Sequence, residues 1–153
     1  MRGVNMSEKK LPKALQEIVT DFALADRREK LDLLLQYAES LPPLPERYQG
    51  KHEELESVPE CMTPVFIAVE TDDEGRLHYY FDVPPNSPTV RGLAAILYHG
   101  LNGATPEEVL AVPADFYYET GLQDAISHQR LNGFAGMLAH VKRLAAKALE
   151  SRA

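Results

Sequence analysis

The sequence predicts an α+β fold: a single compact domain with a small antiparallel sheet, packed by N-terminal helices and a long C-terminal helix. Apolar residues recur at helical spacing near both ends of the chain, and two runs between residues 65 and 83 alternate with period two. The length of 153 residues suits one domain that buries a sizeable core. Helices grouped around a small antiparallel sheet are typical of α+β proteins. We expect residues 1–10 to be a flexible N-terminus and residues 11–150 to form the domain.

Two helices are predicted at the start of this domain. Asp26 followed three residues later by Glu29 resembles a capping box, which starts the second helix, and Pro42 ends it. Each helix carries an apolar stripe: Leu11, Leu15, Ile18 and Phe22 in the first, then Leu31, Leu34, Leu35 and Ala38 in the second. Residues 42–60 carry four prolines and no apolar period, so we expect a surface loop of a length that is often functional.

The period then changes. Alternating runs on either side of "DDEG" (72–75) predict an antiparallel hairpin over residues 65–83, with one face against helices and the other partly wet. Ser87 and Pro88 predict a helix that Gly100 ends, and Thr105 with Glu108 forms a second capping box. A short helical segment ending at Gly121 follows, and apolar spacing from about Gln129 predicts the long final helix.

Charge and composition exclude several classes of partner. The net charge is -7, which disfavours nucleic acid and anionic membranes as partners. The chain has one cysteine, lacks the apolar core of a signal peptide at its N-terminus, and has no run near the about 20 residues that a membrane span requires. We therefore expect a cytoplasmic protein.

The single cysteine, Cys61, lies at the end of the predicted loop, directly before the first strand run. A cysteine that only fills the core would more naturally occupy an alternating position such as that of Val65. A loop thiol beside a rigid strand is well placed to meet another molecule, so the position favours a functional thiol. Because Glu60 adjoins Cys61, we expect a raised thiol pKa. The thiol should then react slowly until the protein docks on a partner.

The lone cysteine restricts the chemistry. Zinc and iron–sulfur sites need several ligands, so we expect no metal. A Cys-His hydrolase is an alternative, with His128 as the best-placed base. A thiol that receives sulfur needs only a nucleophile and access to a donor.

The stretch "RLNGFAGM" (130–137) is the second candidate region. Arg130 is either a first-turn surface residue or a guanidinium that pairs with a partner carboxylate or offsets the charge of a thiolate. Asn132 could cap or hydrogen-bond nearby loop carbonyls. Glycines at Gly133 and Gly136 are unfavourable inside a helix, which indicates that another segment passes close by. The Cys61 loop is the candidate for that segment.

The order of these features resembles the SufE family of cysteine desulfuration proteins. The resemblance covers roughly residues 11–150 and includes "VPECMTPVF", "TVRGLAAIL", "TPEEVL" and "RLNGFAGML" in register. The family pattern has glycine before the cysteine and serine and tryptophan after it. Here Glu60, Thr63 and Phe66 stand at those positions, and Pro64 removes a backbone donor, which concerns the geometry of the loop more than the thiol.

The resemblance implies a compact fold similar to iron–sulfur scaffold proteins and a function as a persulfide sulfur carrier. Cys61 would accept sulfur from a SufS-like cysteine desulfurase, stimulate that enzyme, and pass the sulfur to a cluster scaffold. The residues implied to lie in the loop or to contact the partner are Glu60, Met62, Thr63, Arg130, Asn132 and Gly133. The carrier would need no cofactor of its own, since pyridoxal phosphate belongs to the desulfurase, and it would be a monomer or weak dimer.

Two alternatives stay open. A non-catalytic module could bind and activate a desulfurase with Cys61 incidental, and it would survive Cys61→Ser. A stand-alone thiol enzyme would turn over a small substrate without a partner. For the carrier, we expect the Cys61 sulfur to be partly buried in the free protein and to move outward on docking.

Overall fold

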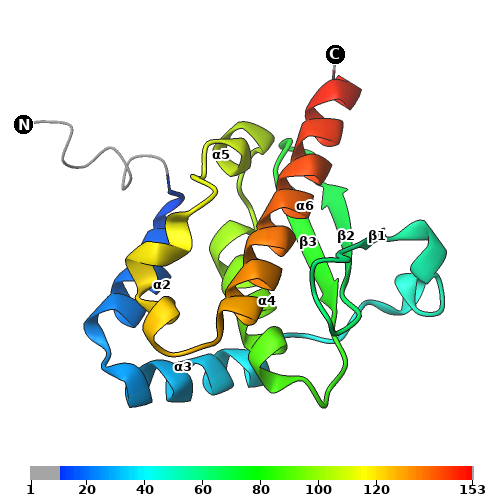
Figure 1. Cartoon of the computed structure of the whole chain (residues 1–153). Helices are drawn as coiled ribbons and strands as arrows, with labels where there is room; N and C mark the ends of the chain where they lie inside the picture. Colours follow the sequence, from blue (N-terminus) through cyan, green and yellow to red (C-terminus); the bar gives the residue numbers. More distant parts are fainter. Residues whose placement is uncertain (1–10, 153) are drawn as a thin grey trace, which may run out of the picture.

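The long helix α6 crosses the front of the molecule, with helices on one side and a small sheet on the other (Figure 1). The structure is a computed structural model that describes residues 11–152, so the predicted flexible segment 1–10 lies outside the described residues. Over that range the helices are α2 (Lys13–Leu24), α3 (Arg27–Ser40), α4 (Pro88–Leu101), α5 (Pro106–Leu110) and α6 (His128–Arg152). The strands are β1 (Glu56–Ser57), β2 (Phe66–Thr71) and β3 (Leu77–Asp82). The predicted α+β fold is confirmed.

Helix α4 is the centre of the fold and is buried along most of its length. Helices α2 and α3 pack on one side of it, while β3 and α6 contact it elsewhere, so the N-terminal helices meet the rest of the core mainly through α4. Close approach is possible because α4 carries glycines at the contacts. A Cβ atom at Gly92 would lie 2.4 Å from the carbonyl oxygen of Leu34, and one at Gly100 would lie 2.6 Å from Cδ1 of Leu15. Gly100 is thus a packing position, and α4 continues one residue past it to Leu101.

The predicted helix caps are largely present. The Asp26 side chain accepts from the Glu29 N–H at 2.9 Å, and Thr105 forms the second capping box with Glu108. Helix α4 begins as predicted, with Ser87 at the N-cap position and Pro88 as its first residue, but the Ser87 side chain makes no capping hydrogen bond. The segment before Gly121 is a 3₁₀ helix, Phe116–Thr120.

The predicted stripe of α3 is wrong at one position. Leu35 is 47% exposed, whereas Leu34 and Ala38 are buried. The buried face also includes Lys30, whose ammonium donates to the Ala25 carbonyl and whose stem lies against Gly121. A lysine can line such a face because its methylene stem is apolar while its charged end finds an oxygen.

The predicted hairpin is confirmed, with β2 and β3 antiparallel and Ile67 opposite Phe81. The alternation in β3 places Leu77, Tyr79 and Phe81 in the core. The free edge of β3 is not left unpaired, since the Tyr79 N–H donates to Asn102 Oδ1 at 2.6 Å. On the core face, the Tyr79 hydroxyl donates to the Val141 carbonyl of α6 at 3.0 Å. The sheet is thereby fixed to both the central and the final helix.

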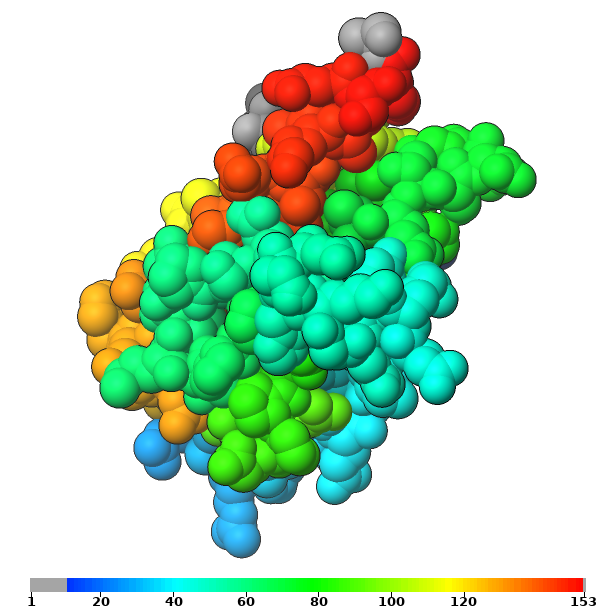
Figure 2. Space-filling model, turned by 90° about the vertical axis from the view of Figure 1, so that its right-hand side faces the viewer, coloured from blue at the N-terminus to red at the C-terminus, as the bar shows by residue number. Residues whose placement is uncertain are grey.

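The prediction of a plain loop over residues 42–60 is wrong. The segment contains short 3₁₀ helices η2 (Glu46–Tyr48) and η3 (His52–Glu54), followed by β1, which pairs with β2. Its side chains cover the outer face of the sheet: Arg47 binds Glu70, and His52 stacks on Phe66 with ring centroids 3.9 Å apart. Figure 2 shows this segment, in cyan, across the middle of the face on the sheet side of the molecule. Single 3₁₀ turns and a two-residue strand have no apolar repeat, so periodicity could not reveal them.

Candidate functional site

Cys61 lies in the connection between β1 and β2, which we call the cysteine loop (residues 58–65). The strand pairing continues into the loop, because the Val58 N–H donates to the Val65 carbonyl at 3.0 Å. Both valines are buried, at 2% and 1% exposure. The loop is therefore clamped at its base, and Cys61 is carried between two fixed ends. Since β1 was not predicted, this rigid base was not foreseen from the sequence.

A tight turn precedes the thiol. The Cys61 N–H donates to the Val58 carbonyl at 3.2 Å, with Pro59 and Glu60 at the two central positions. Proline suits the first of these positions because its φ is already fixed near the value that the turn needs. No non-glycine residue among the described residues has a positive φ, so Glu60 adopts ordinary backbone angles. Glutamate at this position, where the resemblance implied glycine, is accommodated without backbone strain.

The cysteine loop lies against the two glycines of α6. A Cβ atom at Gly133 would lie 3.0 Å from Cys61 Sγ, and one at Gly136 would lie 2.6 Å from Glu60 Cβ. The Cys61 thiol donates to the Gly133 carbonyl at 3.5 Å. The expectation that another segment passes close to these glycines is confirmed, and the Cys61 loop is that segment.

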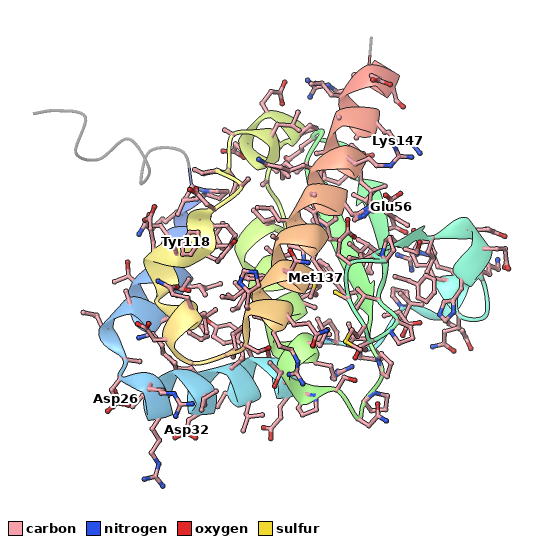
Figure 3. The ribbon with its side chains drawn as sticks, in the orientation of Figure 1. Asp26, Asp32, Glu56, Tyr118, Met137 and Lys147 are labelled. Atoms are coloured by element: carbon pink, nitrogen blue, oxygen red, sulfur yellow. The ribbon has the colours of Figure 1, made fainter. Side chains whose placement is uncertain are left out.

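A cavity of about 250 Å³ opens beside the thiol. Its walls come from three parts of the chain that are distant in sequence: the cysteine loop, the start of α4 and the start of α6. Figure 3 labels Met137 on α6 among these residues. The side of the loop away from β1 is tied to α4, since the Thr63 and Ser87 hydroxyls lie 3.1 Å apart. The lining consists of Cys61, Met62, Thr63, Val90, Leu93, Gln129, Arg130, Gly133 and Met137.

Cys61 is half-buried, as expected for the free protein. Burial raises the pKa of its thiol to about 11, and the neighbouring charge of Glu60 adds to that rise. The sequence anticipated the direction and the effect of Glu60, whereas the larger cause, burial, depends on α6. A pKa of about 11 leaves only about 1 in 10⁴ molecules as the thiolate at pH 7. We therefore expect the thiol of the isolated protein to react slowly at neutral pH.

The three predicted residues at the start of α6 take different positions. Gly133 contacts the thiol, as described above. Arg130 lines the same cavity, and its exposed side chain makes no hydrogen bond or ion pair with any residue between 11 and 152. Asn132 is exposed and outside the cavity, and within the same range its side chain makes no hydrogen bond to a loop carbonyl. Arg130 is thus placed to meet a bound group or partner, while Asn132 is not directed at the thiol.

The rival chemistries receive no support from the geometry. None of the chain's five histidines lines the cavity with Cys61, and the suggested base His128 is exposed at the start of α6. Over residues 11–152, no three His, Cys, Asp or Glu side chains are grouped as metal ligands would be. Within the part of the chain that the structure describes, no helix combines the length and apolar character needed to cross a membrane.

A charged cluster beside the loop was not predicted from the sequence. The ring of His140 on α6 lies between two carboxylates, with Nδ1 2.6 Å from Glu56 Oε2 and Nε2 3.1 Å from Glu60 Oε1. Arg143 also donates to Glu56, at 3.1 Å. Figure 3 shows Glu56 beside α6. A spacing of three, four and three residues places Gly133, Gly136, His140 and Arg143 on one helix face, which is the signal that could have revealed the cluster.

Comparisons with known proteins agree with this architecture. The family model described as "SufE: Fe-S metabolism associated domain" matches residues 16–145. An uncharacterised SufE-like protein of Mycobacterium tuberculosis is 44% identical over 133 residues, covering 87% of this chain and 92% of the relative. A protein of Plasmodium vivax named cysteine desulfuration protein SufE is 24% identical over 145 residues, covering 93% of this chain and 57% of that protein.

A solved structure gives the same result for the fold. The solution structure of a hypothetical protein from Thermus thermophilus superimposes with a TM-score of 0.80 at 36% identity, covering 92% of this chain and 98% of that one. The matched family range contains the cysteine loop, the two glycines of α6 against which it lies, and Arg130. The chain belongs to the SufE family, whose domain is associated with iron–sulfur metabolism.

Proposed function

We propose that this protein accepts persulfide sulfur from a cysteine desulfurase on Cys61, stimulates that enzyme, and delivers the sulfur to iron–sulfur cluster assembly. The observation that carries the proposal is the position of the chain's single thiol: it is half-buried in a clamped loop, above two helix glycines and beside a cavity. Family membership supplies the link to iron–sulfur metabolism. The name of the Plasmodium vivax relative refers to the desulfuration of cysteine.

The chemical step is a thiol–persulfide exchange. Cys61 first loses its proton, and its thiolate then attacks the terminal sulfur of the donor persulfide. The bond between the two donor sulfurs breaks as the new sulfur–sulfur bond forms on Cys61. The donor cysteine leaves as a thiolate and takes up a proton. No net oxidation or reduction occurs, so the step needs no additional redox partner.

Activation on docking is part of this proposal. With a pKa of about 11, the thiol of the free protein is a poor nucleophile at neutral pH. Movement of the loop away from α6 would return the sulfur to water and remove the burial that raises its pKa. The desulfurase then meets a thiol that is reactive only in the complex. The persulfide would be protected from reductants when the loop returned to its seat.

Other residues of the loop and cavity contribute to docking. Met62 is 80% exposed and offers an apolar contact next to the thiol. Arg130 has no partner in the described chain and could pair with a desulfurase carboxylate or offset the charge of the persulfide. Glu60 and Thr63 would set the path of the loop. We propose that the carrier uses no cofactor of its own, with pyridoxal phosphate supplied by a SufS-like partner, and that a scaffold protein receives the sulfur.

The test is transfer of labelled sulfur from a desulfurase loaded with [³⁵S]cysteine. We expect label on the wild type that a thiol reductant releases, and no label on Cys61→Ser. Desulfurase turnover should be faster with the wild type but not with Cys61→Ser. Thr63→Ser, which keeps the hydroxyl that contacts Ser87, is the matched control and should retain transfer. Absence of label from the wild type would refute the carrier function.

A second function is favoured by one observation, the weak nucleophilicity that a buried thiol implies. In that alternative the protein activates a desulfurase by binding alone, and Cys61 is incidental. Equal stimulation by the wild type and by Cys61→Ser would establish it.

A further inference from the structure

The Glu56–His140–Glu60 cluster links three parts of the molecule around the cysteine loop. Glu56 belongs to β1 at the base of the loop, Glu60 precedes Cys61, and His140 lies on α6. Both ring nitrogens of His140 lie within hydrogen-bonding distance of a carboxylate oxygen, and both donate when the ring is protonated. The ring thereby links a fixed carboxylate and a loop carboxylate, and each contact is an ion pair in the protonated form.

The two carboxylates differ in how firmly they are held. The Glu56 side chain is 14% exposed and also binds Arg143, whereas the Glu60 side chain is 41% exposed and has His140 as its ion-pair partner. Glu60 is adjacent to the thiol residue, and its stem lies on Gly136. Release of Glu60 from His140 would free the cysteine loop on the side nearest to the thiol, while Glu56 would keep the ring in place.

We propose that His140 is a positioning residue for Cys61: it holds Glu60 and thereby keeps the cysteine loop closed on α6. We call this Glu56–His140–Glu60 arrangement the latch. Its consequence for sulfur transfer rests on the proposed function, because a desulfurase would have to break the Glu60–His140 pair to extract the loop. Its effect on the exposure of the thiol does not depend on that function.

Electrostatics and the latch predict opposite effects for His140→Ala. Removal of the imidazole leaves the Glu60 carboxylate without its partner, which disfavours the Cys61 thiolate and slows its reactions. Opening of the loop exposes the sulfur and speeds them. The ratio of the alkylation rates with a bulky maleimide and with iodoacetamide separates the two effects. The thiolate is the nucleophile toward both reagents, so the thiolate fraction cancels from the ratio and only the accessibility of the sulfur remains.

The experiment measures this ratio at one pH for the full-length protein. We expect His140→Ala to raise it about fivefold, consistent with the loss of one partly exposed, hydrogen-bonded ion pair. Glu60→Gln should raise it similarly, and the double variant should add nothing, because both changes break the same link. His78→Ala and Glu54→Gln are matched controls: His78 pairs with Asp72 in the β2–β3 turn, and Glu54 is an exposed carboxylate outside the latch. Both should leave the ratio unchanged.

Salt gives an independent readout. High ionic strength screens an ion pair, so the wild-type ratio should rise with added salt while that of His140→Ala stays flat. An unchanged or lower ratio in folded His140→Ala would overturn the latch, and so would an equal salt response in both proteins. If His140→Ala opens the loop but the wild type accepts no labelled sulfur, the latch stands and the carrier function falls.

Discussion

Two pairs of helix glycines in this protein are buried for different reasons. Gly92 and Gly100 of α4 face the N-terminal helices, where an added methyl group would meet the Leu34 backbone or the fully buried Leu15. Gly133 and Gly136 of α6 face the cysteine loop, where it would meet the Cys61 sulfur or the Glu60 side chain.

The first pair allows helices to pack permanently, since neither neighbour can move without opening the core. The second pair forms the contact surface for a loop at the protein surface, which we propose moves away from α6 on docking. A buried glycine in a helix thus indicates a close neighbour, and the mobility of that neighbour decides whether the position serves stability or function. Substitution by alanine separates the two roles.

The largest effect is expected for Gly92→Ala. The new methyl group would lie 2.4 Å from a backbone oxygen, so α3 and α4 must separate. Overpacking of this kind costs about 3 kcal/mol, far more than the about 1 kcal/mol that alanine gains in helix propensity. Urea unfolding followed by circular dichroism measures the loss. A variant as stable as the wild type would show that the α3–α4 contact is adjustable. The glycines of α4 and those of α6 would then not differ in the mobility of their neighbours.

The second largest effect is expected for the alkylation rate of Cys61 in the native protein compared with the unfolded protein. Burial raises the pKa of Cys61 to about 11, against about 8.5 for an unfolded cysteine, so near pH 8 the native thiolate is about two hundredfold rarer. Iodoacetamide should react correspondingly faster in concentrated urea than with the native protein, and the native rate should keep rising up to about pH 11.

The same shift has a consequence for stability. Because the pKa of Cys61 is raised in the folded protein, this shift contributes to the free energy of unfolding. Its contribution is complete below about pH 8.5 and is lost as the pH rises through about 11. Cys61→Ser should lack this part of the alkaline destabilisation. If the rate of Cys61 alkylation in the native protein levelled off near pH 8.5, its contact with α6 would not protect the thiol.

A smaller effect is expected for Gly136→Ala. The methyl group would lie 2.6 Å from Glu60 Cβ, which forces the loop residue away from α6 and weakens its pairing with His140. Because the loop can yield, we expect stability within about 1 kcal/mol of the wild type and a ratio of bulky to small alkylation raised about fivefold. Destabilisation as large as that of Gly92→Ala would mean that the loop belongs to the core.

The smallest effect is expected for Gly133→Ala. Its methyl group would meet Cys61 Sγ at 3.0 Å, a contact that a shift of a few tenths of an ångström relieves. We expect about a twofold rise in the alkylation ratio and a slight gain in stability from helix propensity. The same pair of measurements checks it, and a rise greater than that of Gly136→Ala would place the main closing contact at the sulfur instead of at Glu60.

The sequence predicted those features that depend on neighbouring residues. The capping boxes at Asp26 and Thr105 and the hairpin over 65–83 each arise from short-range hydrogen bonds or period-two alternation. Gly133 and Gly136 announced a close contact because glycine is unfavourable inside a helix. The lone Cys61 between two prolines marked the loop. Local preference was enough for all of these features.

The remaining features depend on segments that are distant in sequence and are brought together by burial. A two-residue β1 forms only because β2 offers it an edge, and the face of α3 that packs inward buries the Lys30 stem and leaves Leu35 exposed. Likewise, His140 becomes a partner of Glu60 only when the loop lies on α6. Local sequence is enough to place one thiol in a loop before a hairpin, whereas the packing of α6 against that loop buries part of the thiol and raises its pKa.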